Sequence, residues 1–381
     1  MPRVARRFLA AAAAAISILH ASPAGADTPP VASSTVSPPA AFAIVAMDSM
    51  RGEWGAAAVS RWLAVGSRSL EARAGAGAWC ALELPDPREA ATLLGLMGQG
   101  IPAPAALDSL LAGDPKRGER QIAILDRSGR GAAFTGDRCP PWAGQRSGAS
   151  YVCQGVGLKD AAARLAMGEA FEKATGTLAD RLLTAVESAE SVFPVREEVE
   201  SAALLVVREG GGLNGGSDRL VDLRVDAAQE AIPELRNDYA ALAATFLPAA
   251  YARFGDEAKR RGDSISAERE YARAESGFRA AVARKPKDAD AWNEIAWFLA
   301  THDRDLEEAI QFAKTAVSMR PRDPMFRDTL AEAEYRSGSL TLAIEEMERA
   351  VKYSGGGARY TDRLARWSRE RAALEGKGSK P

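Results

Sequence analysis

The stretch AFAIVAMDSMRGEWGAAAVS, residues 41–60, contains two short β-rich runs, 42–46 and 54–59, close together along the chain. Further β-rich runs follow at 121–125, 132–135, 151–154, 203–207 and 220–225. Helical spacing of apolar residues occupies 87–98, 103–112, 160–174 and 177–190. Because strands come in adjacent pairs and helices come in adjacent pairs, the order predicts an α+β domain. We expect packed antiparallel sheets with helices on their faces, rather than a doubly wound parallel sheet.

The composition is that of a globular protein and limits the classes of function. The chain has 381 residues, of which 46% are hydrophobic and 26% are charged. These fractions exclude disorder, collagen and a coiled-coil rod as descriptions of the whole chain. At roughly 100–200 residues per domain, the length predicts about two domains. The formal net charge of −2 provides no basic field, so no nucleic-acid partner is expected.

Residues 1–26 have the layout of a secretory signal peptide. Three arginines precede an apolar run from Phe8 to Leu19, and Ala24-Gly25-Ala26 is a cleavage site of the A-x-A type. The apolar run is shorter than the roughly 20 residues that a transmembrane helix needs. We therefore expect a periplasmic or secreted protein without a transmembrane anchor after cleavage. Residues 27–40, rich in proline and serine, are expected to form an extended tether.

From about residue 241 the pattern becomes nearly all helical and repeats itself. Ala309 and Ala343 are 34 residues apart, and so are Ala316 and Ala350. The residues of the repeat signature are Trp292, Ala296, Ala309, Ala316, Pro321, Ala331, Ala343 and Ala350. This period and pattern resemble the tetratricopeptide repeat. The resemblance implies helical repeats over 241–357 that bind a protein or peptide partner, followed by a capping helix and basic tail over 358–381.

A second resemblance covers residues 41–236. Its matching pieces are AFAIVA at 41–46, GEWG at 52–55, RAGAG at 73–77, WAG at 142–144, SAALL at 201–205 and DRLVDLRV at 218–225. In this order they resemble the bacterial family known as domain of unknown function 1028. The resemblance implies a four-layer α/β/β/α sandwich of the N-terminal-nucleophile-hydrolase-like (Ntn) type over 41–240. Some members carry an appended module suspected of binding peptidoglycan, which makes peptidoglycan a further candidate partner.

The same resemblance implies a catalytic position that this chain does not fill. Ntn hydrolases use a Thr, Ser or Cys at the start of the first strand, with its own α-amine as the base. Ala41 stands there in this chain, and Gln145 and Val156 replace the histidine and asparagine that the family usually shows. We therefore expect no catalytic residue in the domain. Candidate ligand-binding residues are Arg73, Asp126, Gln145, Gln154 and Arg219.

The cysteines leave two alternatives open. An exported chain permits a disulfide, and Cys139 and Cys153 could form one, with Cys80 left over. In the other interpretation, all three are small buried side chains. No histidine lies within residues 41–240 and no C-x-x-C motif is present, so no metal site and no cofactor are expected.

Two classes of function remain. The first is an exported, non-catalytic interaction protein, in which a degenerate Ntn-type domain holds a ligand and the helical repeats bind a partner. The second is an Ntn-type amidohydrolase that acts on a small amide or a cell-wall peptide. Alanine at position 41 favours the first class, because a methyl group supplies no nucleophile.

Overall fold

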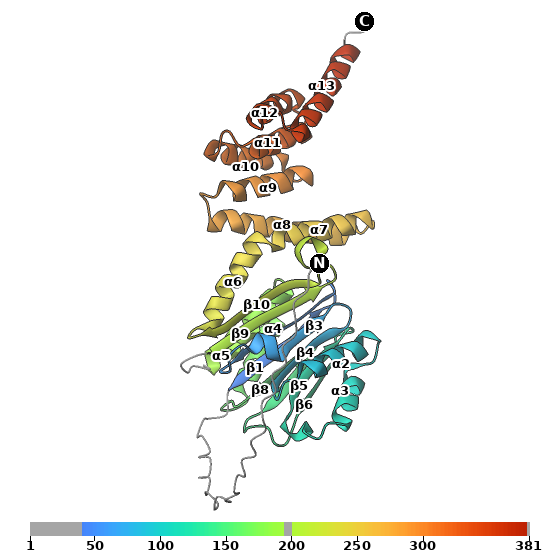
Figure 1. The fold of residues 1–381 in the computed structure, drawn as a ribbon, viewed down its shortest axis with the longest axis vertical. Coiled ribbons are helices and arrows are strands. Elements are labelled where there is room, and N and C mark those ends of the chain that lie inside the picture. Colours follow the sequence, from blue (N-terminus) through green and yellow to red (C-terminus); the bar gives the residue numbers. More distant parts are fainter. Residues whose placement is uncertain (1–39, 194–199, 379–381) are drawn as a thin grey trace, which may run out of the picture. The chain divides into compact units, whose positions relative to one another are not determined.

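A computed structural model describes residues 40–193 and 200–378. The expected signal peptide and nearly all of the tether lie outside these residues. Ten strands in the described part form two antiparallel sheets (Figure 1). The larger sheet has the order β10 (Arg219–Ala228), β9 (Glu200–Arg208), β2 (Glu53–Ser60), β1 (Ala41–Asp48), β8 (Tyr151–Val156) and β7 (Gly144–Gly148). The smaller sheet has the order β3 (Leu70–Arg73), β4 (Gly77–Glu83), β5 (Gln121–Asp126) and β6 (Gly131–Thr135).

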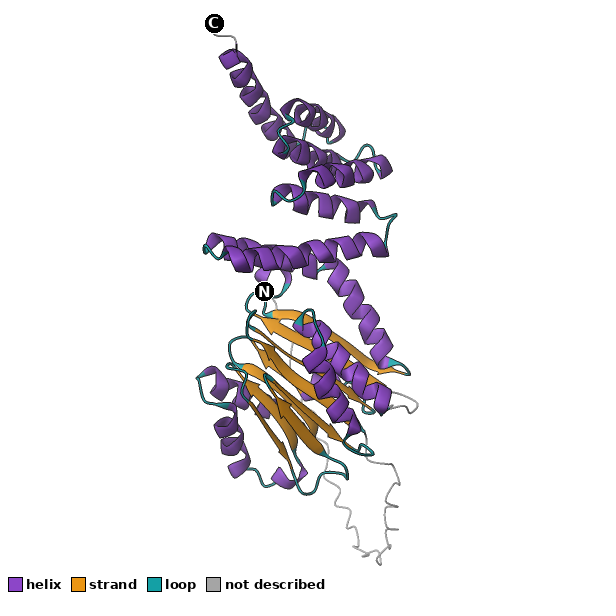
Figure 2. Cartoon of the chain, turned by 180° about the vertical axis from the view of Figure 1, so that it is seen from behind, coloured by secondary structure: helices purple, strands orange, loops and turns teal. Residues whose placement is uncertain are grey.

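The alternation of side chains along β1 explains the layers of this domain. Ala41, Ala43 and Val45 belong to an apolar cluster that includes residues of the smaller sheet, while Phe42 and Ile44 belong to a cluster with helices. Successive side chains of a strand point to opposite faces of the sheet, so β1 is buried on both of its faces. Figure 2 shows helices on the outer faces of the two sheets. The domain is therefore a four-layer α/β/β/α sandwich, as expected.

Each outer layer is a pair of helices that the sequence pattern had indicated. The smaller sheet is covered by α2 (Pro87–Gly98) and α3 (Ala103–Ala112), which pack on Trp79, Ile122 and Ile124. The larger sheet is covered by α4 (Ala162–Lys173) and α5 (Leu178–Val192). A short helix, α1 (Val65–Ser69), follows β2. The strands β3, β4 and β7 were not predicted, because their alanine-, glycine- and polar-rich sequences lack runs of β-branched residues.

The C-terminal region consists of helices that pair as antiparallel hairpins. They are α6 (Ala231–Thr245), α7 (Leu247–Arg260), α8 (Ser264–Arg284), α9 (Ala289–Thr301), α10 (Leu306–Met319), α11 (Pro324–Arg336), α12 (Leu340–Tyr353) and α13 (Ala358–Gly378). Figure 1 shows α9 beside α10 and α11 beside α12. Helix α6 runs through residue 240 and packs on β10 and β9, so the change of pattern falls inside a helix. None of the described helices is long and apolar enough to cross a membrane.

The signature alanines lie where the helices approach most closely. Ala296, Ala309, Ala316, Ala331, Ala343 and Ala350 are all completely buried. Pro321 follows the end of α10, where it cannot continue the helix. Trp292 differs from the others because it is only partly buried. Its ring packs 5.2 Å from the Phe312 ring, and its Nε1 donates to the Pro286 carbonyl at 2.9 Å.

Glu334 on α11 makes the stability of the helical region depend on pH. The side chain is buried, and its Oε2 has no hydrogen-bond partner among the residues that the structure describes. Burial, assisted by the neighbouring Glu346 carboxylate, raises the pKa of Glu334 to about 7. The folded state therefore binds a proton at Glu334 more tightly than the unfolded state does. The stabilisation of the fold by this proton is complete below the unfolded pKa of about 4.3 and is lost as the pH rises towards 7.

We expect Glu334→Gln to melt like the parent near pH 4 and at a higher temperature near pH 8. The neutral amide avoids the cost of a buried charge at the higher pH. Thermal unfolding of both proteins across this range checks the prediction, with Glu348→Gln on the exposed side of α12 as the control. An equal difference in melting temperature at both ends of the range would contradict it.

Candidate functional site

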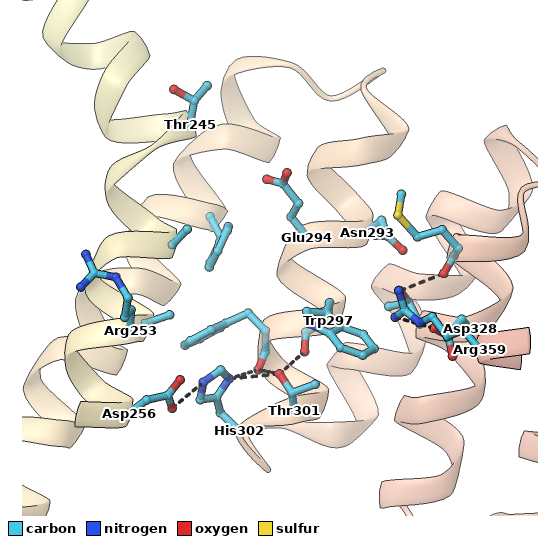
Figure 3. Close-up of a pocket in the computed structure, with 16 residues that line it drawn as sticks. Thr245, Arg253, Asp256, Asn293, Glu294, Trp297, Thr301, His302, Asp328 and Arg359 are labelled. Atoms are coloured by element: carbon cyan, nitrogen blue, oxygen red, sulfur yellow. Dashed lines mark hydrogen bonds and ion pairs between the residues drawn. The ribbon is translucent and has the colours of Figure 1, made fainter. Parts of the chain in front are cut away.

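The helical region contains a groove with a volume of about 520 Å³ (Figure 3). Most of its wall comes from α7, α9 and α11, the first helix of each hairpin, with one residue each from α6, α8 and α13. The lining residues are Thr245, Ala249, Ala252, Arg253, Asp256, Phe278, Asn293, Glu294, Trp297, Phe298, Thr301, His302, Met325, Asp328, Thr329 and Arg359. First helices facing one side are a property of stacked helical repeats, which form extended concave surfaces.

Aromatic side chains form the apolar part of the groove. Phe278 and Phe298 are buried, and their ring centroids lie 5.3 Å apart. Trp297 is half-buried beside them, and Met325 is 42% exposed on α11. Asn293, Trp297 and Thr301 follow one another at intervals of four residues, which places them on one face of α9. The opposite face of α9 carries the residues that pack against the neighbouring helices.

Two polar side chains of α9 have unused hydrogen-bonding capacity. Asn293 is only 6% exposed, and its Oδ1 has no hydrogen-bond partner within residues 40–193 and 200–378. Glu294 makes no ion pair or hydrogen bond with any residue that the structure describes. Desolvation of its carboxyl group raises the pKa of Glu294, and the carboxylates of Asp290 and Asp288 raise it further. Buried polar groups without partners are rare in proteins, so Asn293 presents an unmet hydrogen-bonding need to this groove, whereas Glu294 is exposed and presents a solvated carboxylate.

The arginines of the groove are already paired within the protein. Arg253 donates from Nη2 to the Gly210 carbonyl at 2.6 Å, and Arg359 donates to an Asp328 carboxylate oxygen at 2.9 Å. Asp328 is buried, and burial raises its pKa although Arg363 and Arg359 lower it. Figure 3 shows the Arg359–Asp328 contact at one side of the groove.

His302 and Asp256 form a separate polar contact in the groove. The Nε2 of His302 lies 3.3 Å from an Asp256 carboxylate oxygen (Figure 3), and the hydroxyl of Tyr271 donates to the same carboxylate at 2.8 Å. The Nδ1 of His302 lies 2.8 Å from the Phe298 carbonyl oxygen. The hydroxyl of Thr301 lies 3.2 Å from the Nδ1 of His302 and donates to the Trp297 carbonyl at 2.7 Å, so its hydrogen is used within α9.

The structure places Ala41, the position of the family nucleophile, in the interior of the α/β domain. Ala41 pairs with Ser60 and with Val156, is 2% exposed, and belongs to the apolar cluster between the sheets. Gln145 and Gln154 lie opposite each other on β7 and β8, at the same end of the larger sheet. Gln145 accepts from the Thr135 hydroxyl at 2.5 Å, and the Nε2 of Gln154 donates to the Cys80 carbonyl at 3.3 Å.

The remaining candidate ligand-binding residues lie elsewhere and serve local contacts. Asp126 is buried at the opposite end of the domain, where it accepts from the backbone N–H groups of Ala103 and Ser128 at 3.1 and 2.8 Å. Arg73 is exposed at the end of β3. Arg219 pairs with Glu71 at 3.1 Å. The five candidates therefore do not form one site, because the strands that carry them place them at different ends and edges of the sheets.

The three cysteines are free thiols, so the Cys139–Cys153 disulfide is not formed in this structure. Cys153 is buried in the apolar cluster that contains the helices of the larger sheet, where burial raises its pKa. Cys139 is half-buried, and its Sγ donates to the Arg120 carbonyl at 3.2 Å. Residues 40–193 and 200–378 contain no cluster of His, Cys, Asp and Glu that could hold a metal ion.

The groove residues on α9 were missed by the sequence analysis. The repeat pattern directed attention to Trp292, Ala296 and the other positions that pack the hairpins together. Asn293, Glu294 and Trp297 lie between those positions in the sequence. A helix that buries one face leaves its other face open to solvent or a ligand. The positions of the first helix that do not pack against its neighbours would therefore have indicated these groove residues.

The architecture defines a two-sheet α/β domain followed by a helical region that resembles tetratricopeptide repeats. The chain belongs to the family of unknown function DUF1028, whose family model matches residues 41–235. A DUF1028 protein from Silicibacter pomeroyi, known from a crystal structure, is 28% identical in sequence. The match has a TM-score of 0.51 and covers 55% of this chain and 90% of that chain.

The helical region has its own, more distant matches among solved structures. The Sgt2 tetratricopeptide-repeat domain from Aspergillus fumigatus is 19% identical, with a TM-score of 0.29, and the match covers 36% of this chain and 87% of that chain. The second such domain of human RPAP3, solved in complex with an HSP70 peptide, is 19% identical, with a TM-score of 0.25 and coverages of 32% and 98%. No functionally curated protein is significantly similar in sequence to this chain.

Proposed function

We propose that this protein is a non-catalytic interaction protein that binds an extended segment of a partner polypeptide in the groove of its helical region. The observation that carries the proposal is the Oδ1 of Asn293, which is buried without a hydrogen-bond partner among the described residues, beside the half-buried ring of Trp297. A side-chain amide has both donors and an acceptor, which match the carbonyl and N–H of a peptide group. Rotation of the amide would present either end to the bound backbone.

The apolar part of the groove would supply most of the binding energy. Trp297 and Met325, with the buried Phe298 beneath them, form a surface on which apolar side chains of an extended segment can be buried. Aromatic residues in partly desolvated pockets carry much of the energy of protein interfaces. The groove volume of about 520 Å³ lies within the range of about 300–1,000 Å³ that is typical of ligand sites.

For the α/β domain, we propose that it does not hydrolyse amides. Supporting this, Ala41 provides only a methyl group, and its nitrogen is part of the peptide bond with Ala40 rather than a free α-amine. The polar candidates around the sheets lie apart and are used in local hydrogen bonds. An Ntn-type amidohydrolase needs a nucleophile, a base and oxyanion donors within reach of one another, so this alternative has less support.

We also propose that the protein acts outside the cytoplasm, in the periplasm or after secretion. The support is the basic start, apolar run and Ala24-Gly25-Ala26 site of the N-terminal segment. Peptidoglycan remains a candidate partner on the family resemblance alone. The proposal of export would be overturned if the intact mass of the protein, purified from its own cell envelope, corresponds to a chain that still starts at Met1.

The proposed function is tested by peptide display on the purified mature protein, followed by fluorescence anisotropy with the selected peptides. We expect Trp297→Ala to weaken binding by about tenfold or more, because it removes the exposed ring of the groove. Trp62→Ala is the matched control, since Trp62 is 55% exposed on the α/β domain and should bind as the parent does. Mass spectrometry of the bound peptides is expected to recover them uncut.

Two results would overturn this proposal. One is the failure of display to select any peptide that binds the parent protein. The other is a Trp297→Ala variant that binds the selected peptides as well as the parent and the Trp62→Ala control. Cleavage of the peptides by the parent protein would instead support the amidohydrolase.

A further inference from the structure

The charges that line the groove are unequally available to a ligand. Two arginines and three carboxylates face it, namely Arg253, Arg359, Asp256, Glu294 and Asp328. Both arginines are occupied: Arg253 bonds to the Gly210 carbonyl and lies 3.4 Å from Glu257, and Arg359 bonds to Asp328. Asp328 has a second arginine partner, Arg363, at 2.6 Å. These internal contacts offset part of the positive charge that the two arginines would offer to an acidic ligand.

Glu294 is the exception among these charged groups. Within residues 40–193 and 200–378 it has neither an ion-pair partner nor a hydrogen-bond donor. In Figure 3 its side chain extends from α9 on the side that faces Thr245, in the open part of the groove. It lies one residue from Asn293 and three from Trp297 on the same helix, so a ligand seated on the tryptophan would reach it.

The surroundings of Glu294 are acidic on its own helix. The charged groups that act on its carboxyl group are Asp290 and Asp288, and both oppose its ionisation. A neighbouring hollow of about 240 Å³ is lined by Glu294 and these two aspartates. It is also lined by Arg284, the last residue of α8, and by Lys285, which follows that helix. Neither of these two cations is paired with Glu294. Asp290 is paired with Arg320, and a cation brought by a ligand would pair with Glu294 and favour its ionised form.

From these contacts we infer that the groove selects a segment with a lysine or arginine side chain next to the apolar residue seated on Trp297. This inference rests on the proposed function and specifies the chemistry of the partner. The ligand's cation would donate to the Glu294 carboxylate in a charge-assisted hydrogen bond. The partner is thus expected to be a basic, partly apolar extended segment rather than an acidic one.

The test is a display selection on the full-length mature protein with a library of extended peptides of random sequence. We expect lysine and arginine to be enriched, and aspartate and glutamate depleted, next to an apolar position. Anisotropy with one selected peptide should show that Glu294→Gln weakens binding by about fivefold and Glu294→Lys by more, because attraction becomes repulsion. Raising the salt concentration should reduce this difference.

Glu348→Gln is the matched control, since Glu348 is exposed on α12, which does not line the groove. This variant should bind the peptide as the parent does. Selected peptides that are neutral or acidic, with affinities unchanged in Glu294→Gln but lost in Trp297→Ala, would overturn this inference and leave the proposed function standing. Failure to select any binding peptide would overturn both.

Discussion

Replacing Arg208 by alanine is expected to destabilise the protein by about 3–5 kcal/mol, because it removes the closest cation of two buried carboxylates and leaves them with Arg273, 3.9 Å from an oxygen of each. Arg208 on β9 lies 2.8 Å from Glu270 of α8 and 3.5 Å from Glu53 of β2. Its guanidinium also lies 3.6 Å from the ring centroid of Phe254 on α7. Glu53 and Glu270 are 1% and 3% exposed, so water cannot replace the lost arginine.

Urea unfolding followed by tryptophan fluorescence and circular dichroism measures this loss. Arg224→Ala provides the matched control, since Arg224 is an exposed arginine of β10 that pairs with Asp222 at 3.0 Å. Removal of such a surface pair should cost no more than about 1 kcal/mol. If the free energy of unfolding decreases by the same small amount in both variants, the buried ion network does not stabilise the contact of β9 with α7 and α8.

Trp367→Ala is the second substitution with a large expected effect, again about 3–5 kcal/mol. Trp367 on α13 is completely buried, and its ring stacks on the Tyr335 ring with centroids 4.7 Å apart. The cluster around it joins α11, α12 and α13 through Ala331, Met347 and others. Removing the indole would leave a large cavity and open the end of the helical stack.

Trp367→Phe separates the loss of packing from the loss of the indole N–H. In the described part of the chain, the Nε1 of Trp367 has no hydrogen-bond partner, so phenylalanine loses no hydrogen bond seen there and keeps most of the apolar contact. We expect it to cost clearly less than alanine in the same unfolding experiment. Equal losses for phenylalanine and alanine would mean that the ring does not hold α13 in place.

The layers of the fold could be predicted where a regular pattern of burial controls the sequence. Phe42, Ile44 and Val45 lie on a strand buried on both faces, and such strands read as continuous apolar runs. The completely buried alanines, such as Ala309 and Ala343, reveal the helical repeat because only small side chains allow the helices to approach so closely. By contrast, β7 (Gly144–Gly148) is a mostly exposed edge strand and carries no apolar pattern.

The site was predictable only in its location. The repeat period pointed to a concave protein-binding surface, but it did not show that Asn293 and Glu294 lack partners. That property depends on what α7, α11 and α13 place around them, and these helices lie far from α9 in sequence. In the α/β domain, polar candidates could be named from the sequence, but the local contacts that they make could not. Asp126 and Arg219 looked suited to a ligand, yet a charged residue close to turns and strands often serves its own backbone and neighbours.

Hydrogen exchange of the full-length protein, with and without a saturating selected peptide, tests the central claim most directly. A segment bound in the groove should slow amide exchange in α7, α9 and α11, whose residues line it, and leave α2, α3 and the strands β1, β2 and β8 unchanged. Protection that appears at β1 and β8, where Ala41 and Val156 pair, would contradict the account and place the binding site in the α/β domain.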